Sequence, residues 1–565
     1  MNKIILSGMD DFKEIRDMKA LYIDKSDFIE ELLNLKSVAV SISRPRRFRK
    51  TLNMSMLSYF FDINNGEKNR ELFKNLKIAK SPFFSHQGQY PVINLTFKNF
   101  KAMNFKESYN KIVKLIISEY DRHPYLKDSP MLTDIEKKNY KKILIGEANK
   151  AYIESSLGDL SKYLYKHYGK KVVILVDEFD TPVIEGELKG YYEEVSNFMQ
   201  SFLGEALKGN ISIFKGVVTG ITKLQGAGIF SGVNSVDICT IFEEEYRDKF
   251  GFTENEVKEL LREYGIESKE EEVGEYYNGY NFAGEVIYNP YSVVKYIKKG
   301  KFGNFWLSSN SNDLARKKVE NLLGIRGDET FRKEMENLLQ RKKVKIAVKE
   351  ALKISKEMKA EDILNLLLYS GYLKYENCTK EVSLEYVDVS IPNLEIKAIY
   401  DQWIEEEYTK GEIGDLKKSL QSVCGGDEEE IKQRLEKYLC RRSLFDREGV
   451  LEMDYHNFLF GLLQGLEGNY VLDSNKESGE GRFDIMLTPI KKEKGNKQEK
   501  SGVIIELKVG DKDKLKNLSK EALKQMEEKK YYKSFEDQGI KKVRLVGIAF
   551  NKKDVEVTLK ELTLG

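Results

Sequence analysis

Asp484, Glu506 and Lys508 are residue types that bind a divalent cation and move a proton, and they lie close together near the C-terminal end of the chain. In a strand, residues two apart point to the same face, so Glu506 and Lys508 project together and Leu507 points away. If this strand pairs with the strand headed by Asp484 as a hairpin, the second carboxylate lies beside them. Mg²⁺ on Asp484, Glu506 and the backbone carbonyl of Leu507 would then activate water for attack on a phosphodiester, with Lys508 orienting the nucleophile.

The same pattern has a structural alternative, because Glu-x-Lys on a strand is common and a hairpin could simply expose its charges. Three features favour a site: the run Val503–Leu507 is otherwise apolar, Asp484 lies at strand-pair distance, and a helix follows with Gln525 and Tyr531. Glu477 is a weaker candidate for a supporting ligand. His456, at the start of the preceding expected helix, either contacts substrate or has a structural role.

A second group of residues surrounds the segment SRPRRFRKT, residues 43–51, which lies between an apolar run and an expected helix. A strand, a loop and a helix with Lys-Thr at the junction are typical of a phosphate-binding loop, whose usual pattern is G-x-x-x-x-G-K-[ST]. Here both glycine positions, Arg44 and Arg49, are arginine. Lys50 and Thr51 still offer a cation and a hydroxyl that can face Mg²⁺. The arginines could bind phosphate of a nucleotide or a nucleic acid, or could lie in a solvated turn.

Two more strand ends belong to the same predicted α/β unit. The apolar run 172–176 ends in Asp177 and Glu178; the first can hold Mg²⁺ through water and the second can polarise an attacking water. The next apolar strand ends in Thr219, with Lys223 shortly after, a hydroxyl and a cation suited to sensing a γ-phosphate. Each piece alone also fits a purely structural role, so it is their common order that indicates a nucleotide site.

Seven segments in one order resemble the bacterial AAA-ATPase-like proteins whose C-terminus carries a PD-(D/E)XK nuclease-like domain. They are FKEIR, YIDKS, SRPRRFRKT, LVDEFDTPV, TGITK, YYNGYNF and YNPY, followed by GRFD, IIELKV and the helix with Gln525. The resemblance covers nearly the whole chain. It implies a nucleotide site on Arg46, Arg47, Phe48, Arg49, Lys50, Thr51, Asp177 and Thr219, with Glu178 catalytic and with Thr51 and Asp177 near Mg²⁺. It implies a nuclease site on Asp484, Glu506, Lys508 and Gln525, the last as the auxiliary glutamine.

Arg49 is the position where the loop departs from that family, in which it usually reads RPRRFGKT. The arginine at position 44 therefore agrees with the usual sequence of that family. A side chain at residue 49 hinders close approach of the backbone to phosphates. The Arg49 guanidinium could also fill the phosphate position or pair with Asp177. Both weakened nucleotide binding and loss of binding remain open, and ATP hydrolysis is in doubt.

The whole sequence has 565 residues, 41% of them hydrophobic and 33% charged, which predicts several globular domains. The net charge of +2 neither demands nor excludes a nucleic-acid partner. Four scattered cysteines without C-x-x-C spacing fit a reducing cytoplasm. The N-terminal segment turns acidic before any apolar stretch long enough for a signal peptide, and no long apolar run occurs. We therefore expect a cytoplasmic protein without membrane association.

The alternation of short apolar runs with amphipathic helices predicts the α/β class. We expect a P-loop NTPase-like (AAA-type) parallel sheet in residues 1–240, a helical lid or winged-helix-like middle region in 241–425, and a restriction-endonuclease-like α/β domain in 426–565. The expected strands are 37–42, 90–95, 171–176, 211–219, 482–489, 503–509 and a last one at 542–550. The main expected helices are 105–120, 147–168, 253–261, 363–370 and 456–466.

These expectations lead to a Mg²⁺-dependent nuclease regulated by a nucleotide-binding module. Nucleic acid, with DNA favoured, and ATP or another nucleotide are the expected partners, and a homo-oligomer is left open. The alternative is a pseudo-ATPase that serves in signalling or as a scaffold, whose nuclease-like domain binds nucleic acid without cleaving it.

Overall fold

The computed structural model describes most of the chain in two compact units, Met1–Lys397 and Ala398–Gly565. The described residues are 5, 8–221, 236–306, 314–323, 329–339, 341–349, 352, 358–381, 384–409, 423–440, 451–463, 470–474, 477–478, 481–490 and 501–564. None of the helices in these ranges combines the length and the apolar character needed to cross a bilayer.

The first unit is organised around a five-stranded sheet whose strand pairs are all parallel. Its spatial order is β2 (Val92–Thr96), β3 (Val172–Asp177), β4 (Ile213–Gly220), β1 (Ala39–Ser43) and β5 (Val236–Cys239). Every residue of β1 and β3 is buried, as expected for a parallel sheet covered on both faces. Because parallel strands end at the same edge, the residues that follow β1, β3 and β4 meet there.

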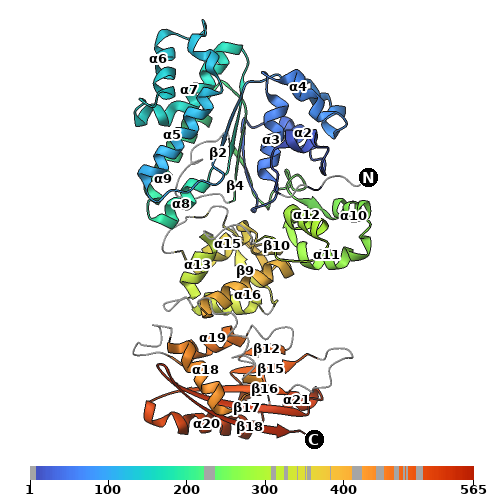
Figure 1. The fold of residues 1–565 in the computed structure, drawn as a ribbon, viewed down its shortest axis with the longest axis vertical. Coiled ribbons are helices and arrows are strands. Elements are labelled where there is room, and N and C mark those ends of the chain that lie inside the picture. The colour runs from blue at the N-terminus through green and yellow to red at the C-terminus, as the bar shows by residue number, and fades with distance from the viewer. Residues whose placement is uncertain are drawn as a thin grey trace. The chain divides into compact units, whose positions relative to one another are not determined.

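Helices cover both faces of this sheet (Figure 1). In the view of Figure 1, α5 (Phe105–Asp121), α7 (Lys150–Tyr168) and α9 (Tyr192–Leu207) lie on one side and α3 (Lys50–Phe61) on the other. The four predicted strands 37–42, 90–95, 171–176 and 211–219 are confirmed, with ends shifted by one or two residues. β5 was not predicted, because its four residues are too few to show a pattern. The remaining helices of this region are α1 (Phe12–Asp17), α2 (Asp27–Asn34), α4 (Gly66–Arg70), α6 (Asp134–Leu144) and α8 (Thr181–Lys189).

The rest of the first unit mixes helices with two small sheets. The helix expected at 253–261 is confirmed as α10 (Glu254–Glu263), which begins with a capping box in which Thr253 and Glu256 bind each other's backbone N–H. One sheet has the order β6 (Phe252–Thr253), β8 (Glu285–Tyr288), β7 (Tyr280–Phe282), and the other β10 (Lys374–Glu381), β11 (Leu384–Ser390), β9 (Val344–Ala347). The other helices are α11 (Glu270–Tyr277), α12 (Pro290–Lys299), α13 (Leu314–Leu323), α14 (Glu329–Leu339) and α15 (Ala360–Ser370). Helix α16 (Leu394–Thr409) begins in this unit and continues into the next.

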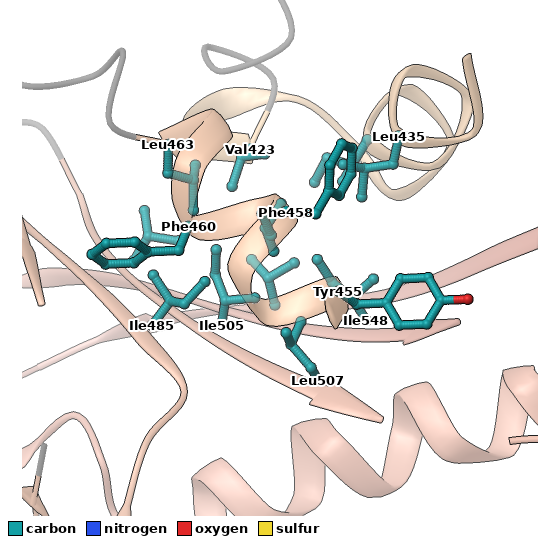
Figure 2. Close-up of a cluster of buried hydrophobic side chains, with 14 of the residues drawn as sticks. Val423, Leu435, Tyr455, Phe458, Phe460, Leu463, Ile485, Ile505, Leu507 and Ile548 are labelled. Atoms are coloured by element: carbon teal, nitrogen blue, oxygen red, sulfur yellow. The ribbon is translucent and has the colours of Figure 1, made fainter. Parts of the chain in front are cut away.

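The second unit contains a mixed five-stranded sheet in which only β16 and β17 pair in parallel. Its order is β12 (Tyr470–Ser474), β15 (Ile485–Pro489), β16 (Gly502–Val509), β17 (Lys542–Asn551) and β18 (Asp554–Thr563). Between β12 and β15 in the chain, β13 (Glu477–Ser478) and β14 (Gly481–Arg482) form a separate short hairpin. One face packs against α18 (Glu428–Cys440) and α19 (Glu452–Leu463), whose Phe458 and Tyr455 meet Ile505 and Leu507 (Figure 2). The other face packs against α20 (Leu515–Glu528) and α21 (Lys533–Asp537).

One expectation for this unit is confirmed and two needed correction. The hairpin between the strands of Asp484 and Glu506 is confirmed, because β15 and β16 pair antiparallel. The strand at 542–550 is not the last one, since β18 follows and pairs with all of β17. Helix α19 begins at Glu452 rather than at His456. The polar stretch 491–500 between β15 and β16 lies outside the described residues.

Candidate functional site

The hairpin β15–β16 brings the two predicted carboxylates together. Ile485 pairs with Ile505, and Asp484 and Glu506 are the neighbours in sequence of these two paired residues. The backbone N–H of Leu507 donates to Asp484 Oδ2 at 2.7 Å, which fixes that carboxylate against β16. Ile504 packs on the α20 side of the sheet and Leu507 on the α19 side. Glu506 and Lys508, in step with Ile504, therefore face α20.

Glu506 is a buried carboxylate whose charge is incompletely compensated. Its side chain is 4% exposed, its Oε1 lies 3.8 Å from Lys508 Nζ, and its Oε2 has no hydrogen-bond partner in the described part of the chain. Burial, together with the neighbouring Asp484, raises the pKa of Glu506 to about 8, against the opposing charge of Lys508. Burial also raises the pKa of Asp484, although the bond from Leu507 opposes that shift.

Gln525, the predicted auxiliary residue, does reach this centre. Its Nε2 donates to Glu506 Oε1 and lies 3.3 Å from the Tyr531 hydroxyl oxygen. Helix α20 can come this close because Gly547, which pairs with Glu506 on β17, has no side chain. A Cβ on Gly547 would lie 2.2 Å from the backbone oxygen of Ser519 in α20. The absence of a Cβ at Gly547 thus allows α20 to lie close enough for Gln525 to reach Glu506.

The donor set at this centre fits a hard divalent cation. Asp484 is half-buried and Glu506 is buried, both have raised pKa values, and Glu506 has an unbonded oxygen, so a cation bound here would remove an electrostatic penalty. Within the described residues, no group of three or more His, Cys, Asp or Glu side chains forms a ready metal cluster. Asp484 and Glu506 would therefore need backbone oxygens or water to complete the coordination of Mg²⁺.

Two residues of α19 border the same centre. His456 is buried, and its Nε2 lies 3.1 Å from the backbone oxygen of Asp484, so it contacts the site through the main chain. Glu452, which the sequence reasoning missed, has a pKa raised by burial and by Asp484, and lowered by Lys508. An acidic residue one helical turn before His456 was the available signal. The side chain of Glu477 lies outside the described part of the structure.

The second group of residues meets at the edge of the sheet in the first unit. Asp177 is 2% exposed and accepts hydrogen bonds from Thr51 Oγ1 at 2.8 Å and from Thr219 Oγ1 at 2.5 Å. Because β4 lies between β1 and β3, Thr219 sits between the loop and Asp177. Glu178 follows with φ of 54°, and burial raises its pKa while Lys50 lowers it. Thr222 and Lys223 lie outside the described residues.

Lys50 begins α3 and turns back onto its own loop. Its Nζ donates to the backbone oxygens of Arg44 and Pro45, each at 2.8 Å. The side chain is buried, and burial lowers the pKa of Lys50, although nearby carboxylates, Glu178 foremost, oppose that shift. A phosphate would thus have to replace two carbonyl partners of this ammonium.

Arg49 has the backbone conformation for which glycine is usual, with φ of 60° and ψ of 25°. A side chain in this left-handed region costs about 1 kcal/mol. The guanidinium neither fills the phosphate position nor pairs with Asp177, so both suggestions for it were wrong. It stacks 4.4 Å from the ring centre of Phe252, where burial lowers the pKa of Arg49 to about 10.

The other loop residues are buried or half-buried against the protein, which is not the arrangement of a solvated basic turn. Phe48 packs against Tyr280 and Phe282, and Arg47 lies 3.8 Å from the ring centre of Tyr291. Arg44 is fully buried and donates to backbone oxygens of four residues, Ser43, Cys239, Thr240 and Glu245. Arg46 is partly buried, and its backbone oxygen accepts a bond from Trp306 Nε1 at 3.4 Å. The YYNGYNF and YNPY segments therefore hold the loop.

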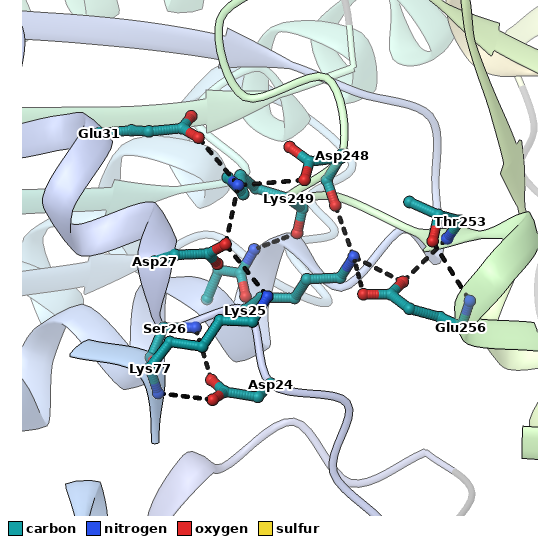
Figure 3. Close-up of polar contacts among 11 residues, drawn as sticks. Asp24, Lys25, Ser26, Asp27, Glu31, Lys77, Asp248, Lys249, Thr253 and Glu256 are labelled. Atoms are coloured by element: carbon teal, nitrogen blue, oxygen red, sulfur yellow. Dashed lines mark hydrogen bonds and ion pairs between the residues drawn. The ribbon is translucent and has the colours of Figure 1, made fainter. Parts of the chain in front are cut away.

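A network of charges fixes the segment that carries Phe252 (Figure 3). Lys25, from the YIDKS segment, donates to the backbone oxygen of Asp248 at 2.6 Å and to Glu256 at 2.7 Å. Lys249 pairs with three carboxylates, those of Asp27, Glu31 and Asp248. Through these bonds α2 and α10 hold the ring beneath Arg49 in place.

Comparison with known proteins agrees with both halves of this description. Residues 7–230 match the family described as Predicted AAA-ATPase, and residues 450–559 match the PD-(D/E)XK nuclease superfamily. A curated relative is named "Uncharacterized protein in vnfD 5'region", from Azotobacter chroococcum mcd 1. It is 22% identical over 399 residues, which cover 69% of this chain and 68% of that protein. The chain therefore combines an AAA-ATPase-like domain in residues 7–230 with a C-terminal PD-(D/E)XK nuclease superfamily domain in residues 450–559.

Proposed function

We propose that the C-terminal domain is a Mg²⁺-dependent nuclease acting on nucleic acid, with DNA as the favoured substrate. The observation that carries this proposal is that Asp484 and Glu506 adjoin the paired residues Ile485 and Ile505, the first half-buried and the second buried, both with raised pKa values and with Lys508 on the face of Glu506. An ordinary core would not keep two such carboxylates together, because burying like charges is costly.

Each residue of the proposed nuclease site would have a separate role. Asp484, Glu506 and the carbonyl of Leu507 would hold the cation, which when bound would lower the pKa of a water and neutralise charge on the phosphodiester. Lys508, an ammonium close to Glu506, would orient the attacking water. Gln525 would keep Glu506 in one rotamer through its bond to Oε1. His456 would support the backbone of Asp484 from the opposite side of the sheet.

We further propose that the N-terminal domain binds ATP or another nucleotide with Mg²⁺ and thereby regulates the nuclease. Lys50 would exchange its two carbonyl partners for phosphate oxygens. Thr51 and Asp177 would hold Mg²⁺, and Thr219 would orient Asp177. Glu178 would serve as the base if hydrolysis occurs.

Cleavage of plasmid and single-stranded DNA by the full-length protein, with and without Mg²⁺, tests the first proposal. Asp484→Ala and Glu506→Ala should each lower the cleavage rate by about 10³-fold or more, as expected when a principal catalytic group is removed. Glu385→Ala, an exposed residue of β11, is the matched control and should cleave like the wild type. Cleavage that persists in both carboxylate variants would overturn the metal-site assignment.

The competing function is a nucleic-acid-binding scaffold without cleavage. The observation that favours it is the lack of a third acidic or histidine ligand among the described residues at the carboxylate pair. A gel-shift assay in parallel with the cleavage assay separates the two. DNA binding that resists Asp484→Ala, with no Mg²⁺-dependent product in the wild type, would establish the scaffold instead.

A further inference from the structure

Glu395 is a fully buried carboxylate in the first turn of α16, and it belongs to neither of the two candidate sites. Its Oε1 accepts the backbone N–H of Phe305 at 2.7 Å and of Trp306 at 3.0 Å. Ser292 of α12 donates to the same carboxylate, at 2.7 Å to Oε2. Burying a carboxylate is costly, and these donors offset that cost.

The two residues that Glu395 fixes also contact the phosphate-binding loop. Arg47 Nη1 donates to the backbone oxygen of Phe305 at 3.3 Å, and Trp306 Nε1 donates to the backbone oxygen of Arg46 at 3.4 Å. Arg47, with φ of 67°, needs such support because the left-handed region disfavours a side chain. The short segment Phe305–Trp306 is thus bound on one side by the loop and on the other by Glu395.

The start of α16 is itself firmly seated. Asn393 accepts the N–H of Ile396 at 3.0 Å and donates to the backbone oxygen of Asn278 at 2.6 Å. Gly279, with φ of 101°, allows Pro392 to approach so closely that a Cβ would lie 2.2 Å from the Pro392 oxygen. The YYNGYNF segment, which the nucleotide site alone does not explain, therefore fixes the place where α16 begins.

On the basis of the proposed nucleotide binding, we infer that Glu395 is a positioning residue for the phosphate-binding loop. It holds Phe305 and Trp306, which hold Arg47 and Arg46, so the loop takes its binding conformation only when the start of α16 is in place. Glu395 lies in the first turn of α16, and α16 continues past Lys397 into the second unit. The residue that positions the nucleotide loop is therefore on the helix at which the chain passes from one unit to the next.

Titration of full-length protein with Mg·ATP by calorimetry tests this inference. Glu395→Ala removes the acceptor of the Phe305 and Trp306 N–H groups as well as of Ser292, and should weaken Mg·ATP binding about tenfold or more, at least the effect of losing one well-placed bond to a charged group. Glu395→Gln keeps an acceptor oxygen for Phe305 and Trp306 and should stay within about threefold of the wild type. The Ala variant thus measures the lost bonds and the Gln variant the lost charge.

Glu119→Ala is the matched control, because Glu119 is also a buried carboxylate with several donors but lies on α5, away from the loop. It should lower the melting temperature and leave the affinity for Mg·ATP unchanged. An unchanged affinity in Glu395→Ala, or an equal loss in Glu119→Ala, would overturn the positioning role while leaving nucleotide binding intact.

A second readout keeps the two proposals separable. The chain has two tryptophans, so Trp403→Phe leaves Trp306 as the single tryptophan, which is excited selectively over tyrosine and lies between Glu395 and the loop. Glu395→Ala should shift the Trp306 emission to longer wavelength and speed deuterium exchange at residues 44–50. If the wild type binds no Mg·ATP, the nucleotide proposal fails. In that case faster exchange at 44–50 would still support positioning, and unchanged exchange would refute it.

Discussion

The two candidate sites differ in how completely their buried charged groups are hydrogen-bonded within the protein. At the carboxylate pair, Glu506 keeps an oxygen without a hydrogen bond and both carboxyl groups have raised pKa values. At the phosphate-binding loop, Lys50 and Asp177 are already satisfied by carbonyls and hydroxyls of the protein. The first site gains from a ligand that brings positive charge, whereas a ligand at the second site must displace internal partners. We therefore expect strong metal dependence at one site and modest nucleotide affinity at the other.

The largest expected effect is on stability without metal. Because the pKa of Glu506 is raised from an ordinary value near 4.5 to about 8, the folded state holds a proton that the unfolded state has lost across this range. Stability should therefore fall as pH rises from about 5 to 8, by a few kcal/mol. Glu506→Gln should remove this loss, so that urea unfolding at pH 8.5 shows the variant more stable than the wild type.

Equal slopes of stability against pH in the two proteins would show that the two sites do not differ in the way described. Glu536→Gln, a change at an exposed carboxylate of α21 in the same unit, controls for general charge effects. It should leave the pH dependence of the wild type unaltered.

A smaller effect is expected from Mg²⁺ itself. Binding to the native state at a concentration about 100 times the Kd adds about 2.7 kcal/mol of stability. The gain should appear in thermal melts of the wild type and be absent in Glu506→Gln, since the variant lacks the second anionic ligand. Equal stabilisation of the wild type and Glu506→Gln by Mg²⁺ would mean that the cation binds elsewhere, and the contrast between the two candidate sites would not hold.

The smallest effect concerns Arg49. Arg49→Gly relieves about 1 kcal/mol of backbone strain and removes bulk beside the phosphate position, so Mg·ATP should bind roughly tenfold more tightly. Lys19→Gly relieves similar strain at an exposed residue with φ of 49° and should not change the affinity. Tighter binding in both variants would mean that overall stability rather than the loop governs affinity.

The sequence predicted those parts of the fold that depend on local periodicity. Continuous apolar runs predicted β1 to β4, and alternation predicted that Glu506 and Lys508 share a face, whereas the hairpin that brings Asp484 to them entered as a condition that the strand pairing then confirmed. The destination of the Arg49 side chain could not be predicted, because Phe252 reaches it only through the packing of a distant segment. Glu452 was missed for a similar reason: its position follows from the true start of α19, which the pattern placed one turn too late.

Strand β18, which the sequence reasoning did not anticipate, has a consequence for handling the protein. It covers the whole length of β17, whose residues Val543–Phe550 are all buried. Strand β18 itself carries charged residues such as Lys560 and Glu561, which discourage pairing with another chain. A truncation before Asp554 would uncover a long apolar edge, and we expect such a shortened protein to aggregate even with every catalytic candidate in place.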